Sequence, residues 1–181
     1  DIKSSRIYDF FDGMLDIKSR TLRAIGKPAE RFEEDALRLV RAVRFASVLP
    51  GFEIEPETLA AIREKAPLIV HVSKERIRAE LSGILLGANP GLGFRLLDTL
   101  GLLEEIIPEL ARLKNIEQSP LYRLEVRSSD DNQKQSVWDH TLKMLDLMAR
   151  LEPRRSVVLA FAVLLHLRVF ATIISAVVSG S

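Results

Sequence analysis

Apolar residues recur at helical spacing along most of the chain. Stretches with apolar residues three and four positions apart alternate with short polar segments, and Gly or Pro stands near many of the gaps. One stretch, residues 21–25, favours a short strand instead. The expected fold class is therefore all-α, with a small β element near the N-terminus. The predicted helices cover residues 36–48, 58–66, 74–86, 93–103, 137–151 and from 156 onward.

Two segments depart from this pattern. Residues 117–136 are polar and charged and separate two apolar halves, so we expect a linker there. Residues 157–178 are nearly all apolar and long enough to span a bilayer, but His166 and Arg168 stand near their middle. An Arg at that depth costs about 2.5–3.5 kcal/mol on insertion scales. We expect a buried helix and no membrane partner, although composition alone leaves insertion open.

Composition and charge limit the possible partners and the compartment. The 26 basic and 25 acidic residues give a net charge of +1, so any RNA contact must be local. The absence of cysteine excludes a disulfide framework, a thiolate zinc site and a cysteine nucleophile, and a cytoplasmic location is the expectation. No signal-peptide pattern is present, and the chain opens without Met. We therefore expect a further segment upstream.

The most informative polar residues are Glu34, Asp35, Arg38 and Arg41, at the start of a predicted amphipathic helix. Acids in a first helical turn suit the helix dipole and can pair with Arg38, which requires no ligand. The alternative follows from hydrogen bonding, because an ionised Asp only accepts and an Arg only donates. Side by side, they match the amine and ring acceptor of cytosine or adenine and mismatch the keto groups of uracil and guanine. The spacing leaves both interpretations open.

Three runs occur in a particular order along the chain. The first is Asp9, three residues and Gly13, followed by Leu22-Arg23; the second is Glu34-Asp35-Ala36-Leu37-Arg38; the third covers residues 73–81. Together they resemble the third, fourth and fifth motifs of the class II tRNA nucleotidyltransferases, the CCA-adding and poly(A) polymerase family. The resemblance implies a helical neck and body from an enzyme that adds C and/or A to the tRNA 3′ end without a nucleic-acid template.

The resemblance also implies roles for the matching positions. Asp35 and Arg38 would read the base of CTP or ATP, with Glu34 and Arg41 supporting them, and tRNA would be the second partner. Outside this group, three further residues would brace the neck. The alternative for these three is that they form exposed ion pairs on one helix surface. Two other residues would form the joint between head and neck. The bracing residues are Glu75, Arg76 and Glu80, and the joint residues are Asp9 and Gly13.

The family's head domain carries the chemistry, and its signature is not in this sequence. A glycine-rich turn and an Asp-x-Asp pair, which hold the triphosphate and the metal ions in such heads, do not occur. We therefore expect no catalytic residue and no metal site in this chain, with Mg²⁺ held by a head domain supplied in cis or in trans. A non-catalytic helical adaptor that binds RNA or protein is the alternative. The expected domains are 1–28 (head remnant), 29–116 (neck and body), 117–136 (linker) and 137–181.

The last of these segments resembles the start of an HD phosphohydrolase domain. His140 and His166 match its first two histidines, but Leu167 stands where a metal-binding Asp belongs, and a later Asp is also missing. A leucine cannot ligate a cation, so we expect a degenerate site without metal and interpret both histidines as core or surface residues. Beyond Leu167 the resemblance stops.

Overall fold

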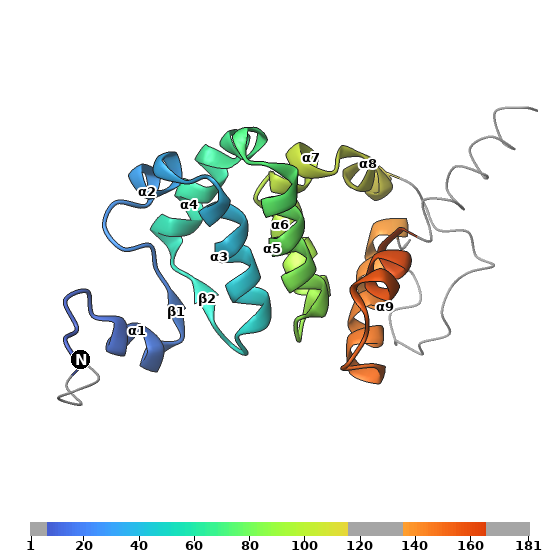
Figure 1. Ribbon diagram of the computed structural model, residues 1–181, viewed down its shortest axis with the longest axis horizontal. Coiled ribbons are helices and arrows are strands. Elements are labelled where there is room, and N and C mark those ends of the chain that lie inside the picture. The colour runs from blue at the N-terminus through green and yellow to red at the C-terminus, as the bar shows by residue number, and fades with distance from the viewer. Residues whose placement is uncertain (1–6, 116–135, 166–181) are drawn as a thin grey trace, which may run out of the picture.

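The chain forms an array of helices with one small sheet, as the computed structural model shows for residues 7–115 and 136–165 (Figure 1). The all-α prediction is confirmed, and most predicted helices are found close to their expected bounds. In chain order, the elements are α1 (Gly13–Ser19), β1 (Thr21–Leu22), α2 (Pro28–Glu34), α3 (Leu37–Val48), β2 (Glu53–Ile54), α4 (Pro56–Lys65), η1 (Ala66–His71), α5 (Lys74–Leu86), α6 (Pro90–Thr99), α7 (Leu102–Ile106), α8 (Pro108–Ala111), η2 (Arg112–Asn115) and α9 (Val137–Leu151), followed by helical residues 157–165.

Local sequence signals set many helix boundaries. Pro is the first residue of α2, α4, α6 and α8, where its missing N–H and fixed φ suit a helix start. The Glu55 carboxylate accepts the Thr58 N–H at 2.7 Å at the start of α4, and the Ser136 hydroxyl accepts the Asp139 N–H at 3.1 Å at the start of α9. The predicted helix 93–103 is divided at Gly101, whose φ of 78° lies in the left-handed region.

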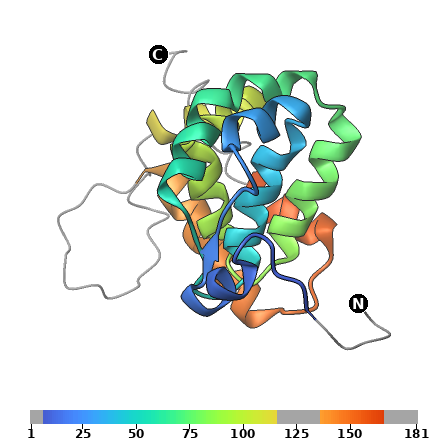
Figure 2. The same ribbon diagram turned by 90° about the vertical axis from the view of Figure 1, so that its left-hand side faces the viewer.

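The predicted strand at residues 21–25 is shorter than expected and has a partner that the sequence pattern did not indicate. β1 pairs in parallel with β2, with Thr21 opposite Glu53 and Leu22 opposite Ile54. The Glu53 N–H donates to the Arg20 carbonyl at 2.9 Å, and the Glu55 N–H donates to the Leu22 carbonyl at 3.0 Å. This pairing ties the N-terminal segment to the loop that follows α3. α1 and β1 therefore lie at one end of the array, away from α9 (Figures 1 and 2).

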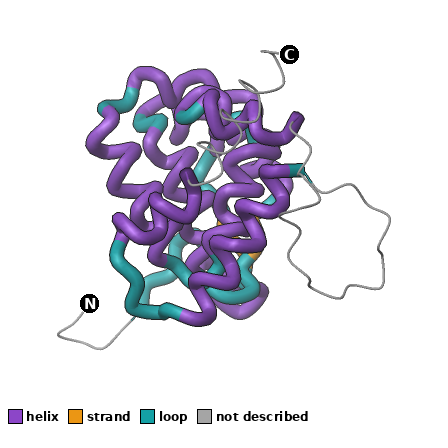
Figure 3. The backbone as a smooth tube through the Cα atoms, turned by 90° about the vertical axis from the view of Figure 1, so that its right-hand side faces the viewer, coloured by secondary structure: helices purple, strands orange, loops and turns teal. Residues whose placement is uncertain are grey.

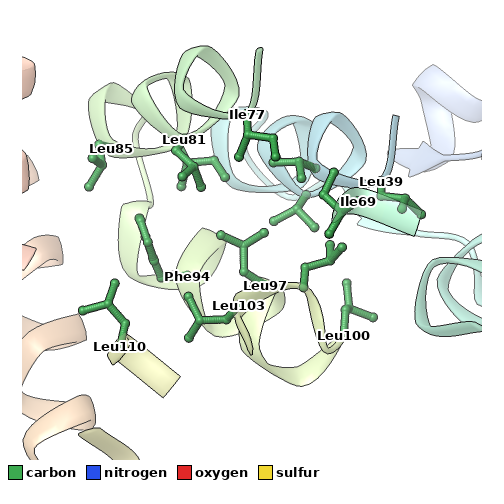
Figure 4. Close-up of a cluster of buried hydrophobic side chains, with 14 of the residues drawn as sticks. Leu39, Ile69, Ile77, Leu81, Leu85, Phe94, Leu97, Leu100, Leu103 and Leu110 are labelled. Atoms are coloured by element: carbon green, nitrogen blue, oxygen red, sulfur yellow. The ribbon is translucent and has the colours of Figure 1, made fainter. Parts of the chain in front are cut away.

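A single hydrophobic core runs through the array. Side chains from α3, η1 and α5 meet side chains from α6, α7 and α8, as Figure 4 shows for ten labelled residues. Phe94 and Leu97 of α6 are fully buried between neighbouring helices. Burying a large apolar side chain contributes about 1.5–3 kcal/mol, so this central cluster holds the helices at fixed positions. The labelled residues are Leu39, Ile69, Ile77, Leu81, Leu85, Phe94, Leu97, Leu100, Leu103 and Leu110.

α9 and helical residues 157–165 pack on the same core at the other end of the array (Figure 1). Seen from that end, most of the described backbone is helical (Figure 3). Trp138 and Leu142 of α9 are buried, and the Asp146 carboxylate accepts the Gly91 N–H of α6 at 2.8 Å. The predicted linker lies outside the described residues except for Ser136, and so do His166, Leu167 and Arg168. The division into four domains stays a prediction. Within the described ranges, no helix is both long enough and apolar enough to cross a membrane.

Candidate functional site

The predicted site residues lie at a break between two helices. α2 ends at Glu34, Asp35 has extended backbone angles of φ −150° and ψ 98°, and α3 begins at Leu37. The expectation that Glu34 and Asp35 form the first turn of the following helix is therefore wrong. The physical reason is local: the Asp35 carboxylate accepts the Leu37 N–H at 3.2 Å, a bond that competes with continuous helix. The break separates the two acids, so that Glu34 closes one helix and Asp35 precedes the next.

The Asp35 carboxylate is held from across the structure by Arg76 of α5. Arg76 Nη2 donates to Asp35 Oδ2 at 3.0 Å and to Oδ1 at 3.3 Å. Burial favours the neutral acid, but the Arg76 and Leu37 hydrogen bonds and the charge of Arg38 outweigh it and hold the pKa of Asp35 below its ordinary value. Asp35 is therefore an ionised acceptor near neutral pH.

Arg38 is oriented by the end of α2. Its Nη1 atom donates to the Arg31 carbonyl at 3.1 Å and to Glu34 Oε2 at 3.0 Å. The other Glu34 oxygen lies 2.9 Å from Arg31 Nη2. Glu34 thus links two arginines on either side of the helix break. The Arg38 side chain keeps 40% of its surface exposed, so its remaining donors stay accessible.

Glu80 of α5 anchors the next turn of α3. Its carboxylate is almost fully buried and contacts two arginines, with Arg41 Nε at 3.0 Å from Oε1 and Arg44 Nε at 2.7 Å from Oε2. Arg44 also lies over the Phe45 ring, with its guanidinium carbon 4.8 Å from the ring centroid. Arg76 and Glu80 therefore pair with residues of the α2–α3 region, and the alternative of exposed ion pairs within α5 is wrong for both.

A pocket of about 440 Å³ opens beside this group of arginines. Its walls come from the segment around β1, from α2, from α3 and from Thr58 of α4. Four arginines line it and no acidic residue does, although their partners Glu34 and Glu80 lie nearby. Arg31 Nε is buried and has no hydrogen-bond partner in the described part of the chain. The lining residues are Leu22, Arg23, Ala24, Ile25, Arg31, Phe32, Arg38, Arg41, Ala42, Phe45 and Thr58.

The predicted joint residues form a local cap. Asp9 Oδ1 accepts the Gly13 N–H and Oδ2 accepts the Met14 N–H, both at 2.8 Å, at the start of α1. The Met14 and Gly13 hydrogen bonds lower the pKa of Asp9 from its ordinary value. Asp9 and Gly13 are thus brought together within one local cap. Glu75 is exposed at the start of α5 and lines a separate groove beside Phe161.

His140 is buried on α9, with 6% of its surface exposed. Its predicted partner His166 lies outside the described residues. In residues 7–115 and 136–165, no group of three or more His, Cys, Asp or Glu side chains is placed to hold a metal ion. The degenerate HD site stays a prediction.

Several residues of this region were not among the predicted site residues. Arg23 and Arg31 line the pocket, Phe45 forms part of its wall, and Arg44 shares Glu80 with Arg41. The spacing of Arg31, Glu34 and Arg38 at three and four residues was a usable signal for the ion pairs. No sequence signal indicated that β1 would close one side of the pocket.

The amino-acid sequence is similar to those of a known protein family. Residues 51–114 match the family described as "Probable RNA and SrmB- binding site of polymerase A". The chain is 46% identical over 102 residues to the CCA-adding enzyme of Limosilactobacillus reuteri and 36% identical over 149 residues to that of Bacillus licheniformis. These matches cover 56% and 80% of this chain, and 25% and 35% of the respective enzymes.

A solved structure agrees with these relatives. The crystal structure of the Bacillus stearothermophilus CCA-adding enzyme in complex with CTP matches with a TM-score of 0.57 and 32% identity, covering 89% of this chain and 41% of that one. The chain belongs to the CCA-adding enzyme family. It spans about a quarter to a third of the length of the two relatives named above.

Proposed function

We propose that this chain supplies base selection and tRNA docking in a template-independent nucleotidyltransferase that adds C and/or A to the tRNA 3′ end. Two comparisons support the proposal. The similar Bacillus stearothermophilus structure is described as a complex with CTP, and residues 51–114 match a probable RNA-binding region. The nucleotide would be read at the α2–α3 junction and the RNA would bind along the body.

The observation that carries this proposal is the unused hydrogen-bonding capacity at the junction. An ionised carboxylate offers about four lone-pair sites, and Asp35 uses three of them, for Leu37 and twice for Arg76. A guanidinium has five N–H donors, and the contacts of Arg38 described above use the two on Nη1. One acceptor and several donors therefore remain. This combination suits the amine and ring acceptor of cytosine or adenine and rejects uracil and guanine.

The pocket beside Arg38 supports a nucleotide ligand. Its four guanidinium groups favour an anion, and Ile25 and Phe45 provide apolar surface for a flat ring. Asp35 is not among the lining residues, so the base-reading pair would lie at the edge of the pocket. The predicted order is a base at the junction and negatively charged groups toward the arginines.

The chemistry of phosphoryl transfer would come from the remainder of the enzyme. Mg²⁺ is expected there, bound by a head domain, where it would neutralise charge on the triphosphate. α1 supports an adjoining domain because none of its residues is buried, while Phe10, Phe11 and Leu15 are each more than 60% exposed. In this proposal, Asp9 and Gly13 lie at the joint with that head.

A chimera tests the proposal. This chain would replace the corresponding portion of the Bacillus licheniformis enzyme, and incorporation of C, A, U and G into tRNA lacking its 3′ end would be measured. We expect C or A to be added and U and G to be rejected. Asp35→Ala and Arg38→Ala should each weaken discrimination by about 1–3 kcal/mol, while melting temperatures stay close to that of the unmodified chimera. Incorporation ratios that match those of the unmodified chimera, together with lower melting temperatures, would show that Asp35 and Arg38 only support the helix junction.

A non-catalytic adaptor is the second candidate, because the RNA-binding match begins at residue 51 and does not include the junction. An adaptor would bind RNA with the same affinity whether or not CTP or ATP is present. The chimera also separates the two functions, since an adaptor gives no base-dependent incorporation.

A further inference from the structure

Arg76 makes the only long-range hydrogen bonds that reach Asp35 within the described residues. The two residues are 41 positions apart, one on α5 and the other between α2 and α3. A single nitrogen, Nη2, bridges both carboxylate oxygens, while the Leu37 N–H approaches Oδ1 from the start of α3. Three hydrogen bonds from two donor groups therefore fix the plane of the carboxylate. The one remaining acceptor position is on Oδ2.

We propose that Arg76 is a positioning residue for base selection, holding the Asp35 carboxylate so that its last acceptor site faces the exocyclic amine of the incoming base. This inference rests on the proposed role of Asp35. A carboxylate attached through one rotatable bond would otherwise turn about its axis and present either oxygen. A freely turning acceptor loses directional hydrogen bonding, and discrimination between an amine and a keto group depends on that direction.

A merely structural role for Arg76 is disfavoured by exposure and by redundancy. The Arg76 side chain is 51% exposed and that of Asp35 is 27% exposed, and ion pairs of this kind contribute little to folding. α5 is already fixed to α3 by the buried Glu80, which pairs with two arginines, and by the buried Ile77 and Leu81. Removing the Arg76 side chain should therefore leave the fold in place and free the Asp35 carboxylate.

The test uses the full chain and four variants. Binding of CTP and UTP would be followed by NMR titration of the backbone amides of residues 35–41, and each variant would also be melted. Asp35→Ala tests the proposed base reader, and Arg76→Ala tests the positioning residue. Arg76→Lys keeps one cationic nitrogen, which is all that the observed contact uses. Arg78→Ala is the matched control, because Arg78 is an exposed cation on the same helix two residues away.

We expect the unmodified chain and Arg78→Ala to prefer CTP over UTP, and Asp35→Ala to lose the preference. Arg76→Ala should reduce the preference by about two- to tenfold, the effect of weakening one hydrogen bond, with an unchanged melting temperature, and Arg76→Lys should recover most of it. If Arg76→Ala keeps the full preference while Asp35→Ala loses it, positioning by Arg76 is wrong and the role of Asp35 stands. A preference that survives Asp35→Ala contradicts the proposed function itself. A loss in Arg76→Ala that Lys does not restore and that accompanies a large fall in melting temperature shows a structural role only.

Discussion

At the residue scale, ionised side chains of this chain join elements that are distant in sequence. Arg76 reaches Asp35, Glu80 reaches Arg41 and Arg44, and each contact crosses from α5 to the α2–α3 region. Helical spacing alone had left local ion pairs within α5 as an alternative. The difference matters for function, because a contact between elements fixes the position of one side chain relative to another element.

Arg155 is the clearest residue-scale case for stability. It is 6% exposed, and its guanidinium donates to the Leu85 carbonyl through Nε at 2.9 Å and Nη2 at 2.6 Å, and to the Gly87 carbonyl at 2.6 Å. These carbonyls lie at the C-terminal end of α5, where cations are favoured and carbonyls lack helical partners. Burial lowers the pKa of the Arg155 guanidinium from its ordinary value.

Arg155→Ala should therefore destabilise the chain by about 2–4 kcal/mol, because it removes charge-assisted hydrogen bonds to the buried Leu85 carbonyl and the partly buried Gly87 carbonyl. Urea unfolding, monitored by circular dichroism, measures the loss. The neighbouring Arg154 is exposed, so Arg154→Ala serves as the control and should change stability by less than about 0.5 kcal/mol. Equal effects of the two substitutions would contradict the stabilising role of the Arg155 hydrogen bonds at the C-terminal end of α5.

At the element scale, the array depends on close approach between α6 and its neighbours. Gly93 of α6 is buried, and a Cβ atom there would collide with Ile84 of α5 and lie 3.1 Å from Ser47 Cβ of α3. The missing side chain allows three helices to meet. Side chains larger than hydrogen require the helices to separate, which costs contacts in the central cluster.

Gly93→Ala should consequently destabilise the chain by about 1–3 kcal/mol, despite the higher helix propensity of Ala. Thr99→Ala places the same residue at an exposed position of α6 and should have little effect. Thermal melts of the two variants provide the comparison. Stabilisation by Gly93→Ala would show that α6 can move away from α5 and α3 without loss.

The sequence pattern predicted long helices well and their junctions poorly. Residues 74–86 and 137–151 coincide with α5 and α9, because each has a complete apolar face and a polar residue at its start. α2 and the break at Asp35 were missed, since a side-chain hydrogen bond decides that boundary. β2 was missed because two residues carry no periodicity, and its pairing depends on the turn at Gly51, with a φ of 74°. The residue types of the site could thus be predicted from the sequence, whereas their interaction partners became visible only in the folded structure.

At the scale of the whole molecule, the array brings the two proposed binding regions next to each other. Asp35 and Arg38 lie outside the RNA-binding match, whereas Arg76 lies within it, so their ion pair joins the proposed nucleotide site to the proposed RNA-binding body. At the α1 end, Phe10, Phe11 and Leu15 are exposed and would face the adjoining domain of the proposed function. The arrangement suits a chain that selects and positions substrates for chemistry performed alongside it.

The isolated chain should accordingly add no nucleotide to tRNA lacking its 3′ end, even with Mg²⁺ present. Two-metal phosphoryl transfer requires carboxylates that hold ions about 3.5–4 Å apart, and the sequence contains no glycine-rich turn followed by an Asp-x-Asp pair. Incorporation of labelled ATP and CTP measures this, with the chimera described above as the positive control. Addition of a separate head domain should raise incorporation only if the two parts associate, which the exposed apolar side chains of α1 favour. Incorporation by the purified chain above the no-protein background, together with its loss in Asp35→Ala, would show that the chain carries catalytic groups of its own. That result would contradict the proposal that a head domain performs the chemistry.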